Sequence, residues 1–310
     1  MPQPDVHPLP GREIVVPAGA SRDGRSVGAL RLHVVEHGAP SRDGKALPLL
    51  MLHGLPATSY LWRDVARDLE HDRLCVMPDL AGCGESERPS SSGESSGQAT
   101  GHASEGSRLE DQASLLLRLL DQLGLERVAV LGADLGGTVA VQLAARARDR
   151  VAALALVGTP LHPLLWPTTP VVPLLVPGVG EALLAALRAR PRLGRRVVAR
   201  ALGARLPDRE LDRYLAALRS REDAAAFLRL VRAVDLRPAE RAWEQLCADP
   251  LPTLVLWGTE DALRSPAYGR RLVAEMPGAI WAPVAGAGHL LPAERPERVA
   301  EEVAGFLAEL

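Results

Sequence analysis

The sequence has little of several features that would each indicate a particular class of protein. Its 310 residues carry a formal net charge of −2, so no basic surface for nucleic acid is expected. Lysine occurs once, at Lys45, and arginine supplies the remaining positive charge, which we interpret as a compositional bias. The three cysteines, Cys75, Cys83 and Cys247, have no C-x-x-C spacing, which indicates a reducing compartment and predicts no metal site.

Long apolar runs are also missing. The most apolar long stretch, Val171 to Leu187, is interrupted by prolines, glycines and a glutamate, and therefore does not predict a membrane-spanning helix. The first residues, Met1 to Asp5, lack the basic and apolar regions of a signal peptide. We expect a cytoplasmic protein whose partners are a small molecule and water, without nucleic acid or membrane. Nothing in the pattern predicts an oligomeric state.

Strand and helix patterns alternate along most of the chain. Apolar or alternating runs predict strands at residues 12–16, 29–36, 48–52, 73–78, 128–131, 151–157, 252–257 and 279–284. Helical patterns are expected at residues 59–70, 109–123, 138–145, 267–276 and 296–310. This alternation is typical of an α/β fold with a mostly parallel central sheet flanked by helices.

The alternation stops between residues 161 and 247. Proline clusters there are followed by helical segments rich in Arg, Ala and Leu, and no strand pattern occurs. We therefore predict a core at residues 1–159 and 248–310, with a helical cap inserted at residues 160–247. Residues 90–107 are rich in Ser and Gly, which predicts a surface loop without a catalytic role.

The chemistry is expected to centre on a strand-to-helix turn at residues 132–137, Gly-Ala-Asp-Leu-Gly-Gly. Small residues around Asp134 give the spacing of a nucleophile elbow, in which a tight turn exposes one side chain. A carboxylate at the tip takes an alkyl group as an ester, whereas the serine usual there takes an acyl group. The plainer interpretation makes Asp134 a helix N-cap, but a cap does not require glycines on both sides.

Two later loops supply a candidate acid and base. Gly258-Thr259-Glu260-Asp261 follows one predicted strand, and Gly286-Ala287-Gly288-His289 follows the last one. Carboxyl ends of parallel strands meet at one edge of a sheet, so these loops are expected near Asp134. We predict that His289 activates water and that Asp261 orients its imidazole, with Glu260 as the rival acid.

A fourth loop, His53-Gly54-Leu55-Pro56, follows the strand at residues 48–52. The backbone N–H groups of Leu55 and Leu135 are predicted to converge on the ester carbonyl and to stabilise an oxyanion. His53 is expected to hold this loop by hydrogen bonds, without carrying a proton.

These motifs together resemble the α/β-hydrolase superfamily, in the branch that contains epoxide hydrolases and haloalkane dehalogenases. The resemblance covers about residues 30–310 and is carried by HGLPATSYLWRDV (53–65), PDLAGCGESERP (78–89), GADLGG (132–137), LVLWGTED (254–261) and GAGHLLPAERP (286–296). It implies an α/β-hydrolase fold with a helical cap and no cofactor. It also implies attack of Asp134 on a carbon atom, followed by hydrolysis assisted by His289.

The members of this branch differ in what stabilises the leaving group. Dehalogenases generally hold halide with an Asn or Trp side chain, at the position of Leu55 or from the cap, and with a Trp at the position of Leu135. Neither leucine has a side-chain N–H. Epoxide hydrolases usually use two cap tyrosines, and Tyr214 lies where the family has one of them. The other tyrosine is missing, which leaves Trp166 and His162 as candidate donors.

Plainer roles remain open for two of these donors: Tyr214 as a packed helix residue and Trp166 as an apolar pocket wall. The expected pocket is apolar, and no arginine adjoins Asp134 in the sequence, so a small charged haloacid is disfavoured. We therefore predict an epoxide hydrolase that converts an apolar epoxide to a vicinal diol. The alternatives are a haloalkane dehalogenase with an atypical halide site and a non-hydrolytic relative that binds a small molecule.

Overall fold

A computed structural model of the chain describes residues 9–20, 26–41, 46–89, 108–165, 168–204, 206–214 and 220–310. The predicted loop at residues 90–107 and the candidate donor Trp166 lie outside these ranges. No helix in the described part of the chain is long and apolar enough to cross a membrane.

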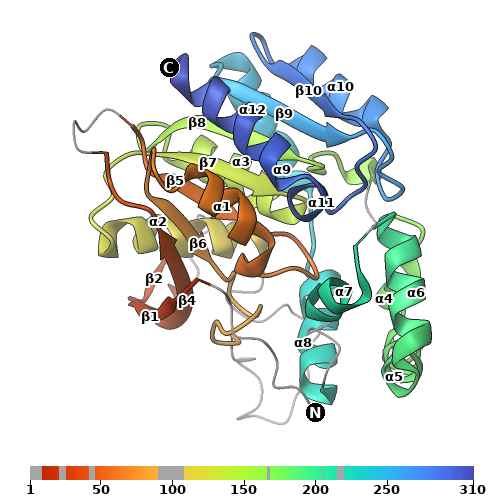
Figure 1. The fold of residues 1–310 in the computed structure, drawn as a ribbon. Coiled ribbons are helices and arrows are strands. Elements are labelled where there is room, and N and C mark those ends of the chain that lie inside the picture. Colours follow the sequence, from red (N-terminus) through yellow and green to blue (C-terminus); the bar gives the residue numbers. More distant parts are fainter. Residues whose placement is uncertain are drawn as a thin grey trace.

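An eight-stranded sheet in the order β1-β4-β6-β5-β7-β8-β9-β10 forms the centre of the molecule (Figure 1). Its strands are β1 (Gly11–Val16), β4 (Leu30–His37), β5 (Leu49–Leu52), β6 (Cys75–Pro78), β7 (Val128–Ala133), β8 (Val151–Val157), β9 (Thr253–Gly258) and β10 (Ile280–Val284). β4 runs antiparallel to both of its neighbours, and the strands from β6 to β10 are parallel. A separate pair joins β2 (Gly19–Ala20) to β3 (Ser26–Val27).

Helices lie on both faces of the sheet (Figure 1). They are η1 (Ser59–Trp62), α1 (Arg63–Leu69), α2 (Leu109–Gln122), α3 (Leu135–Arg146), η2 (Pro163–Leu165), α4 (Val172–Leu175), α5 (Val179–Ala189), α6 (Pro191–Leu202), α7 (Asp208–Tyr214), α8 (Arg221–Arg232), α9 (Arg237–Ala248), α10 (Pro266–Glu275), α11 (Leu291–Glu294) and α12 (Pro296–Ala308). Helices α1 and α12 pack together on one face, and α2, α3 and α9 pack on the other.

The central strands are apolar at every position because both of their faces are covered. Successive side chains point to opposite faces, so Leu50 and Leu52 join the core under α2, α3 and α9. Leu49 and Met51 join the core under α1 and α12. The continuous apolar runs in the sequence therefore build two cores, one on each side of a single sheet.

The segment between β8 and β9 contains helices and no strand in its described residues. Helices α4, α5 and α8 have a small apolar core of their own, which includes Leu174, Leu184 and Leu228. Helix α9 is different, since Trp243 and Leu246 pack in the core beside α3. The sequence places residues up to 247 in the cap, whereas in the structure α9 belongs to the layer that covers the sheet.

The predicted α/β fold with a mostly parallel sheet is confirmed, and the strand expected at residues 151–157 has these bounds. The helix expected at residues 138–145 begins earlier, at Leu135, because α3 starts directly after the turn at Asp134. The helix expected at residues 59–70 opens with a 3₁₀ turn at Ser59 before α1.

The turn from β7 to α3 leaves no room for added side chains. A Cβ on Gly136 would lie 2.2 Å from the Leu52 carbonyl oxygen, and one on Gly137 would lie 1.9 Å from Thr159 Oγ1. A Cβ on Gly132 would come within 2.5 Å of the Gly137 backbone. The small residues of the motif are therefore required by the contact of α3 with β5 and with the loop after β8.

We predict that Gly136→Ala lowers the free energy of unfolding by about 3 kcal/mol, because the obstructing atoms belong to the backbone and cannot rotate away. Urea denaturation followed by circular dichroism measures this change. Gly305→Ala is the matched control, since Gly305 lies at an exposed position of α12 and a Cβ there meets nothing within 4 Å. That substitution is expected to stabilise the protein by about 0.5–1 kcal/mol. Equal effects of the two substitutions would contradict the packing argument.

Candidate active site

Asp134 is held in a strained backbone conformation at the tip of the turn. Its φ is 50° and its ψ −126°, and it is the one non-glycine residue with positive φ in the described ranges. Its side chain makes no capping hydrogen bond to α3, although it occupies the N-cap position. Strain of this kind is common at functional sites, and the missing cap bond argues against a purely structural role.

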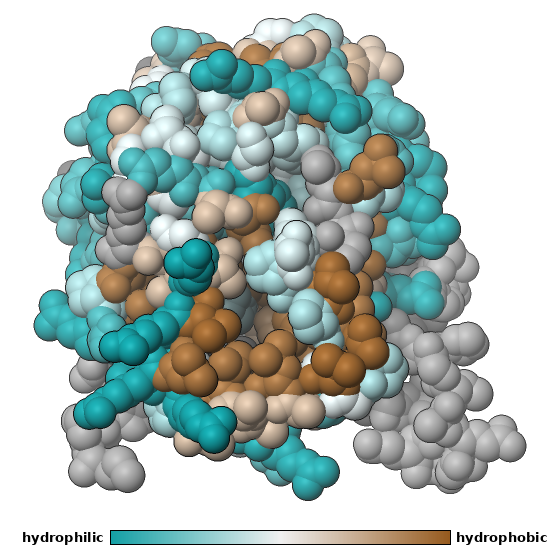
Figure 2. All heavy atoms as spheres, turned by 90° about the vertical axis from the view of Figure 1, so that its right-hand side faces the viewer, coloured by the Kyte–Doolittle hydropathy of each residue, from teal (hydrophilic) through white to brown (hydrophobic). Residues whose placement is uncertain are grey.

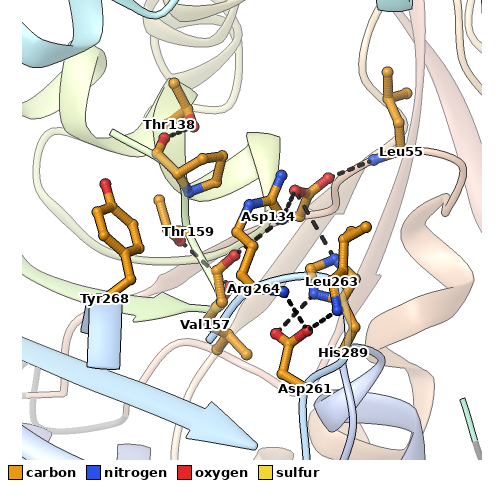
Figure 3. A network of polar contacts seen from close by, with 12 residues as sticks. Leu55, Asp134, Thr138, Val157, Thr159, Asp261, Leu263, Arg264, Tyr268 and His289 are labelled. Atoms are coloured by element: carbon orange, nitrogen blue, oxygen red, sulfur yellow. Dashed lines mark hydrogen bonds and ion pairs between the residues drawn. The ribbon is translucent and has the colours of Figure 1, made fainter. Parts of the chain in front are cut away.

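His289 and Asp261 lie beside Asp134 (Figure 3). The Asp261 Oδ2 atom is 3.0 Å from His289 Nδ1, and His289 Nε2 is 3.9 Å from Asp134 Oδ1. All three side chains are buried. The structure thus brings together the three residues predicted as nucleophile, acid and base, and it is Asp261 rather than Glu260 that contacts the imidazole.

Asp261 is fixed as a carboxylate by its surroundings. Its Oδ1 atom accepts hydrogen bonds from the backbone N–H groups of Leu263 and Arg264, each at 2.9 Å. Burial alone would raise the pKa of Asp261, but the charge of His289 and the hydrogen bonds from His289 and Arg264 hold it below its usual range. An ionised Asp261 favours the His289 tautomer with a proton on Nδ1, which leaves Nε2 free to accept one.

Arg264 is part of this site, and sequence reasoning missed it. Its Nη1 atom lies 2.6 Å from Asp134 Oδ1, and its side chain is 3% exposed. The same nitrogen donates to the Gly158 carbonyl oxygen at 3.4 Å, whereas Nε is buried without a hydrogen-bond partner in the described structure. The backbone of Arg264 is held by Asp261 and by Trp257 Nε1, which donates to its carbonyl oxygen at 3.0 Å.

The expectation that no arginine accompanies the nucleophile is therefore wrong. It rested on the residues next to Asp134 in the sequence, whereas Arg264 arrives from the loop after β9. Its position three residues after Asp261, at the carboxyl end of a strand, was the available signal. The exclusion of charged substrates that followed from a missing arginine no longer holds.

The loop after β5 reaches Asp134 from another side. The backbone N–H of Leu55 donates to Asp134 Oδ2 at 3.2 Å, and Leu55 and Pro56 are joined by a cis peptide bond. A Cβ on Gly54 would lie 2.5 Å from Asp134 Cβ, so this approach requires glycine. Leu135 begins α3, where the first backbone N–H groups have no partner within the helix. Both predicted oxyanion donors thus adjoin Asp134.

Both ring nitrogens of His53 are used within this loop. Nε2 accepts a hydrogen bond from the Leu80 backbone N–H at 2.9 Å, which leaves the proton on Nδ1 for the Gly54 carbonyl oxygen at 2.9 Å. Burial lowers the pKa of His53, consistent with a neutral ring. This geometry supports the predicted structural role, since neither ring nitrogen is free to exchange a proton with a substrate.

Asp79 connects the same loop to its neighbours. Its carboxylate accepts hydrogen bonds from the backbone N–H groups of Ser59 and Glu85, at 2.7 and 2.9 Å, and lies 3.2 Å from His33 Nδ1. Burial opposes ionisation, but the hydrogen bonds and the nearby histidines lower the pKa of Asp79 to about 2. Asp79 is therefore a buried anion that fixes the positions of the loops after β5 and β6.

A cavity of about 280 Å³ opens next to Leu55, between the loop after β5 and helix α8. Its apolar wall includes Leu55, Pro56, Phe227 and Leu230, and its polar wall includes Arg213. Its lining is therefore mixed, with apolar and charged side chains. Leu55, whose N–H binds the Asp134 carboxylate, lines this cavity, whereas Asp134 itself is not among the lining residues.

The candidate cap donors do not gather at Asp134 in the described structure. His162 is bound at both ring nitrogens, by the Tyr268 hydroxyl and by Glu275, each at 3.2 Å. Tyr214 is buried with its ring 6.4 Å from that of Tyr60. Trp166 lies outside the described residues. The charged side chain that pairs with the Asp134 carboxylate is instead Arg264.

Residues 48–296 match the family model for the alpha/beta hydrolase fold. This match covers most of the chain, and the eight-stranded sheet agrees with it. The chain belongs to the α/β hydrolase fold family. The resemblance inferred from the motifs is confirmed, and with it the branch that contains haloalkane dehalogenases.

The individual proteins to which this chain is similar are named for different activities. It is 28% identical to haloalkane dehalogenase 2 of Mycobacterium tuberculosis, over 88% of this chain and 90% of the relative. It is 27% identical to a cis-3-alkyl-4-alkyloxetan-2-one decarboxylase of Shewanella oneidensis, over 86% and 84%. The solved haloalkane dehalogenase DbeA of Bradyrhizobium elkani superposes with a TM-score of 0.74 at 26% identity, covering 97% of this chain and 98% of that one. These similarities support a hydrolase that acts on a small substrate with water.

We predict that Asp79→Asn removes an acid-sensitive part of the hydrolase's stability. Because the folded-state pKa of Asp79 is about 2, below its ordinary value, its stabilisation is present above about pH 4 and is lost as pH falls toward 2. Thermal unfolding of both proteins from pH 7 to pH 2.5 measures this. The difference in melting temperature is expected to shrink as the pH falls. A difference that does not change with pH would contradict the assignment of a buried anion.

Proposed function

We propose that Asp134 is a nucleophile that attacks an sp³ carbon of the substrate and forms an alkyl ester. The observation that carries this proposal is the alignment of Asp134, His289 and Asp261, with separations of 3.9 and 3.0 Å, at a strained elbow. The attack forms a bond from a carboxylate oxygen to carbon and breaks the bond from that carbon to the leaving group, which departs with the electron pair.

Hydrolysis of the ester then needs a base and a place for negative charge. His289 Nε2 accepts a proton from water, and the resulting hydroxide attacks Cγ of Asp134. The Leu55 N–H, which donates to Oδ2 in the resting site, is placed to bind the oxyanion on that atom, together with the Leu135 N–H. Collapse of the tetrahedral intermediate expels the alkoxide, which takes the proton from His289 and leaves as the alcohol. The Asp134 carboxylic acid then loses its proton to solvent, which regenerates the carboxylate.

Arg264 limits the kinds of leaving group that suit the site. In the resting site its charge is balanced by Asp134, but an ester is neutral, so alkylation would leave a buried cation unpaired. A substrate that generates an anion in the same pocket restores the balance. Ring opening does this efficiently, because the new anion remains attached to the alkylated carbon skeleton.

We therefore infer that the substrate is a strained oxygen ring, either an epoxide, as the sequence indicated, or a four-membered lactone. Guanidinium has a planar fork that matches carboxylate, and it does not release its proton near neutral pH. Opening a β-lactone at its alkyl carbon gives a carboxylate, whereas opening an epoxide gives an alkoxide that must still be protonated. Arg264 thus favours the lactone, the ring named in the Shewanella oneidensis relative.

Haloalkane dehalogenation is the second candidate, and its support is the similarity to haloalkane dehalogenases at 26–28% identity. A halide is stable without a proton, so Arg264 suits it in charge. Leu55 and Leu135 nevertheless supply no side-chain N–H for a halide. The leaving-group site would then depend on Arg264 alone among these residues.

His289→Gln is expected to block ester hydrolysis and trap the substrate on the enzyme. Intact-protein mass spectrometry after incubation with aliphatic β-lactones, epoxides and haloalkanes distinguishes the candidates. A ring adds the mass of the whole substrate, whereas a haloalkane adds that mass less HX. Peptide mapping should locate the adduct on Asp134.

The double variant Asp134→Ala/His289→Gln is the matched control and should form no adduct. An adduct that persists in this control, or one on another residue, would contradict nucleophilic attack by Asp134. Absence of any adduct, with no turnover by the unmodified enzyme, would instead favour a non-hydrolytic binding protein.

Arg264→Gln is expected to lower the rate of adduct formation on His289→Gln enzyme by about 10²–10³-fold, since a preorganised cation is lost from the site. This rate is measured by quenching the incubation at a series of times and determining the fraction of modified protein by intact-protein mass spectrometry. Arg270→Gln is the control, because Arg270 is exposed and stacks on Trp281 of β10. An unchanged rate in the Arg264 variant would show that the leaving group does not depend on this guanidinium.

A further inference from the structure

The inserted helices expose large apolar side chains on one side of the molecule. Val172, Val176, Val179, Leu193 and Val197 are each 40–49% exposed. They belong to α4, α5, α6 and the turn after α4, which pack in series. Figure 2 faces the side on which these helices lie and shows apolar side chains gathered around a hollow. We call these five residues the apolar face.

Positive charge accompanies the apolar face. Residues 160–203 contain one carboxylate, Glu181, and the six arginines Arg188, Arg190, Arg192, Arg195, Arg196 and Arg200. Glu181 is already paired with Arg232 of α8, at 2.7 Å. The chain as a whole has a net charge of −2, so positive charge is concentrated on this segment.

Most of these arginines have no anionic partner in the described structure. Arg195 binds Asp212 at 2.9 Å, and Arg188 donates to the Ser220 carbonyl oxygen at 3.2 Å. The remaining four, at positions 190, 192, 196 and 200, are exposed, and no ion pair to another described residue is observed for them. Together with Leu193 and Val197 they give α6 an exposed surface that is both cationic and apolar.

We propose that the apolar face and its arginines dock on an anionic phospholipid bilayer. A helix with aliphatic residues beside arginines lies in a membrane interface, where the aliphatic groups enter the acyl boundary and the arginines bind lipid phosphates. No helix among the described residues could span a membrane, but this mode does not need one, because it buries only one surface of the protein. This proposal departs from the expectation from the sequence that no membrane is involved.

A second copy of the chain fits this surface less well. A two-fold dimer through this face would bring like charges together, with only one carboxylate in the segment to offset them. An acidic protein would satisfy the arginines but has no particular need for a row of exposed valines. A bilayer satisfies both, since phosphate and acyl chains are adjacent in it.

The proposed docking surface is connected to the candidate active site. The last residue of α6, Leu202, accepts a hydrogen bond from the His289 backbone N–H at 3.3 Å. A Cβ on Gly288 would lie 2.4 Å from the Gly203 carbonyl oxygen, so the end of α6 packs directly against the loop that carries His289. A docked α6 would hold the site next to a lipid phase from which an apolar substrate can enter.

Vesicle flotation with the full chain tests the docking. Binding is expected to vesicles of phosphatidylglycerol and phosphatidylcholine in equal parts, and not to phosphatidylcholine alone, and it should weaken as salt rises. Arg190→Gln/Arg192→Gln/Arg196→Gln is expected to lower the partition coefficient by about tenfold or more. Val179→Gln/Leu193→Gln/Val197→Gln should lower it by a similar factor, because less apolar surface enters the bilayer.

The matched control, Arg127→Gln/Arg241→Gln/Arg270→Gln, removes the same charge from exposed arginines elsewhere and should keep the unmodified partition coefficient. Equal loss in this control, or no binding by the unmodified chain, would overturn the proposal. Full binding by the valine and leucine variant would also overturn it, because charge alone would then suffice, as for an acidic protein. Size-exclusion chromatography that shows a dimer abolished by that variant would assign the face to a second copy.

Discussion

A close backbone contact lies beneath Asp134, and the candidate site depends on it. Helix α3 starts directly against β5 and the loop after β8, at distances that only Gly132, Gly136 and Gly137 permit. This contact forces Asp134 to positive φ and points its carboxylate away from α3, where it makes no capping bond. Packing energy from the two cores of the sheet thus supports a strained residue that could not hold this conformation alone.

Charge balance is the second constraint on the site. Asp134, Arg264, Asp261 and His289 are buried together: the Arg264 guanidinium lies 2.6 Å from the Asp134 carboxylate, and His289 Nδ1 and two backbone N–H groups hold Asp261. The backbone of Arg264 is anchored by Asp261, so one turn after β9 positions both the acid and the cation. Any reaction that removes the negative charge of Asp134 therefore leaves Arg264 without its counterion. For this reason the proposed nucleophile also restricts the charge that the leaving group must carry.

The inserted helices have only a small apolar core, and part of their apolar surface remains exposed to solvent. Helices α4, α5 and α8 share a few buried leucines and valines, whereas α6 buries little beyond Gly194 and Leu202. Because Leu193 and Val197 of α6 belong to no core, they remain exposed, beside arginines that have no anionic partner among the described residues. The same helix ends at the loop of His289, where the Leu202 carbonyl oxygen accepts a hydrogen bond from the His289 backbone N–H. Binding of a partner to α6 would therefore act close to the proposed base.

The sequence by itself determined the sheet, the elbow and the order of the candidate nucleophile, acid and base. Continuous apolar runs identify buried parallel strands, and the glycine spacing identifies the turn, because both are local consequences of backbone geometry. Tertiary structure alone decided the rest. Arg264 pairs with Asp134, which is 130 positions away in the sequence. His162 binds Tyr268 and Glu275, and α9 packs against α3 and not with the other inserted helices. Such contacts depend on which distant elements pack together, and therefore no local sequence pattern predicts them.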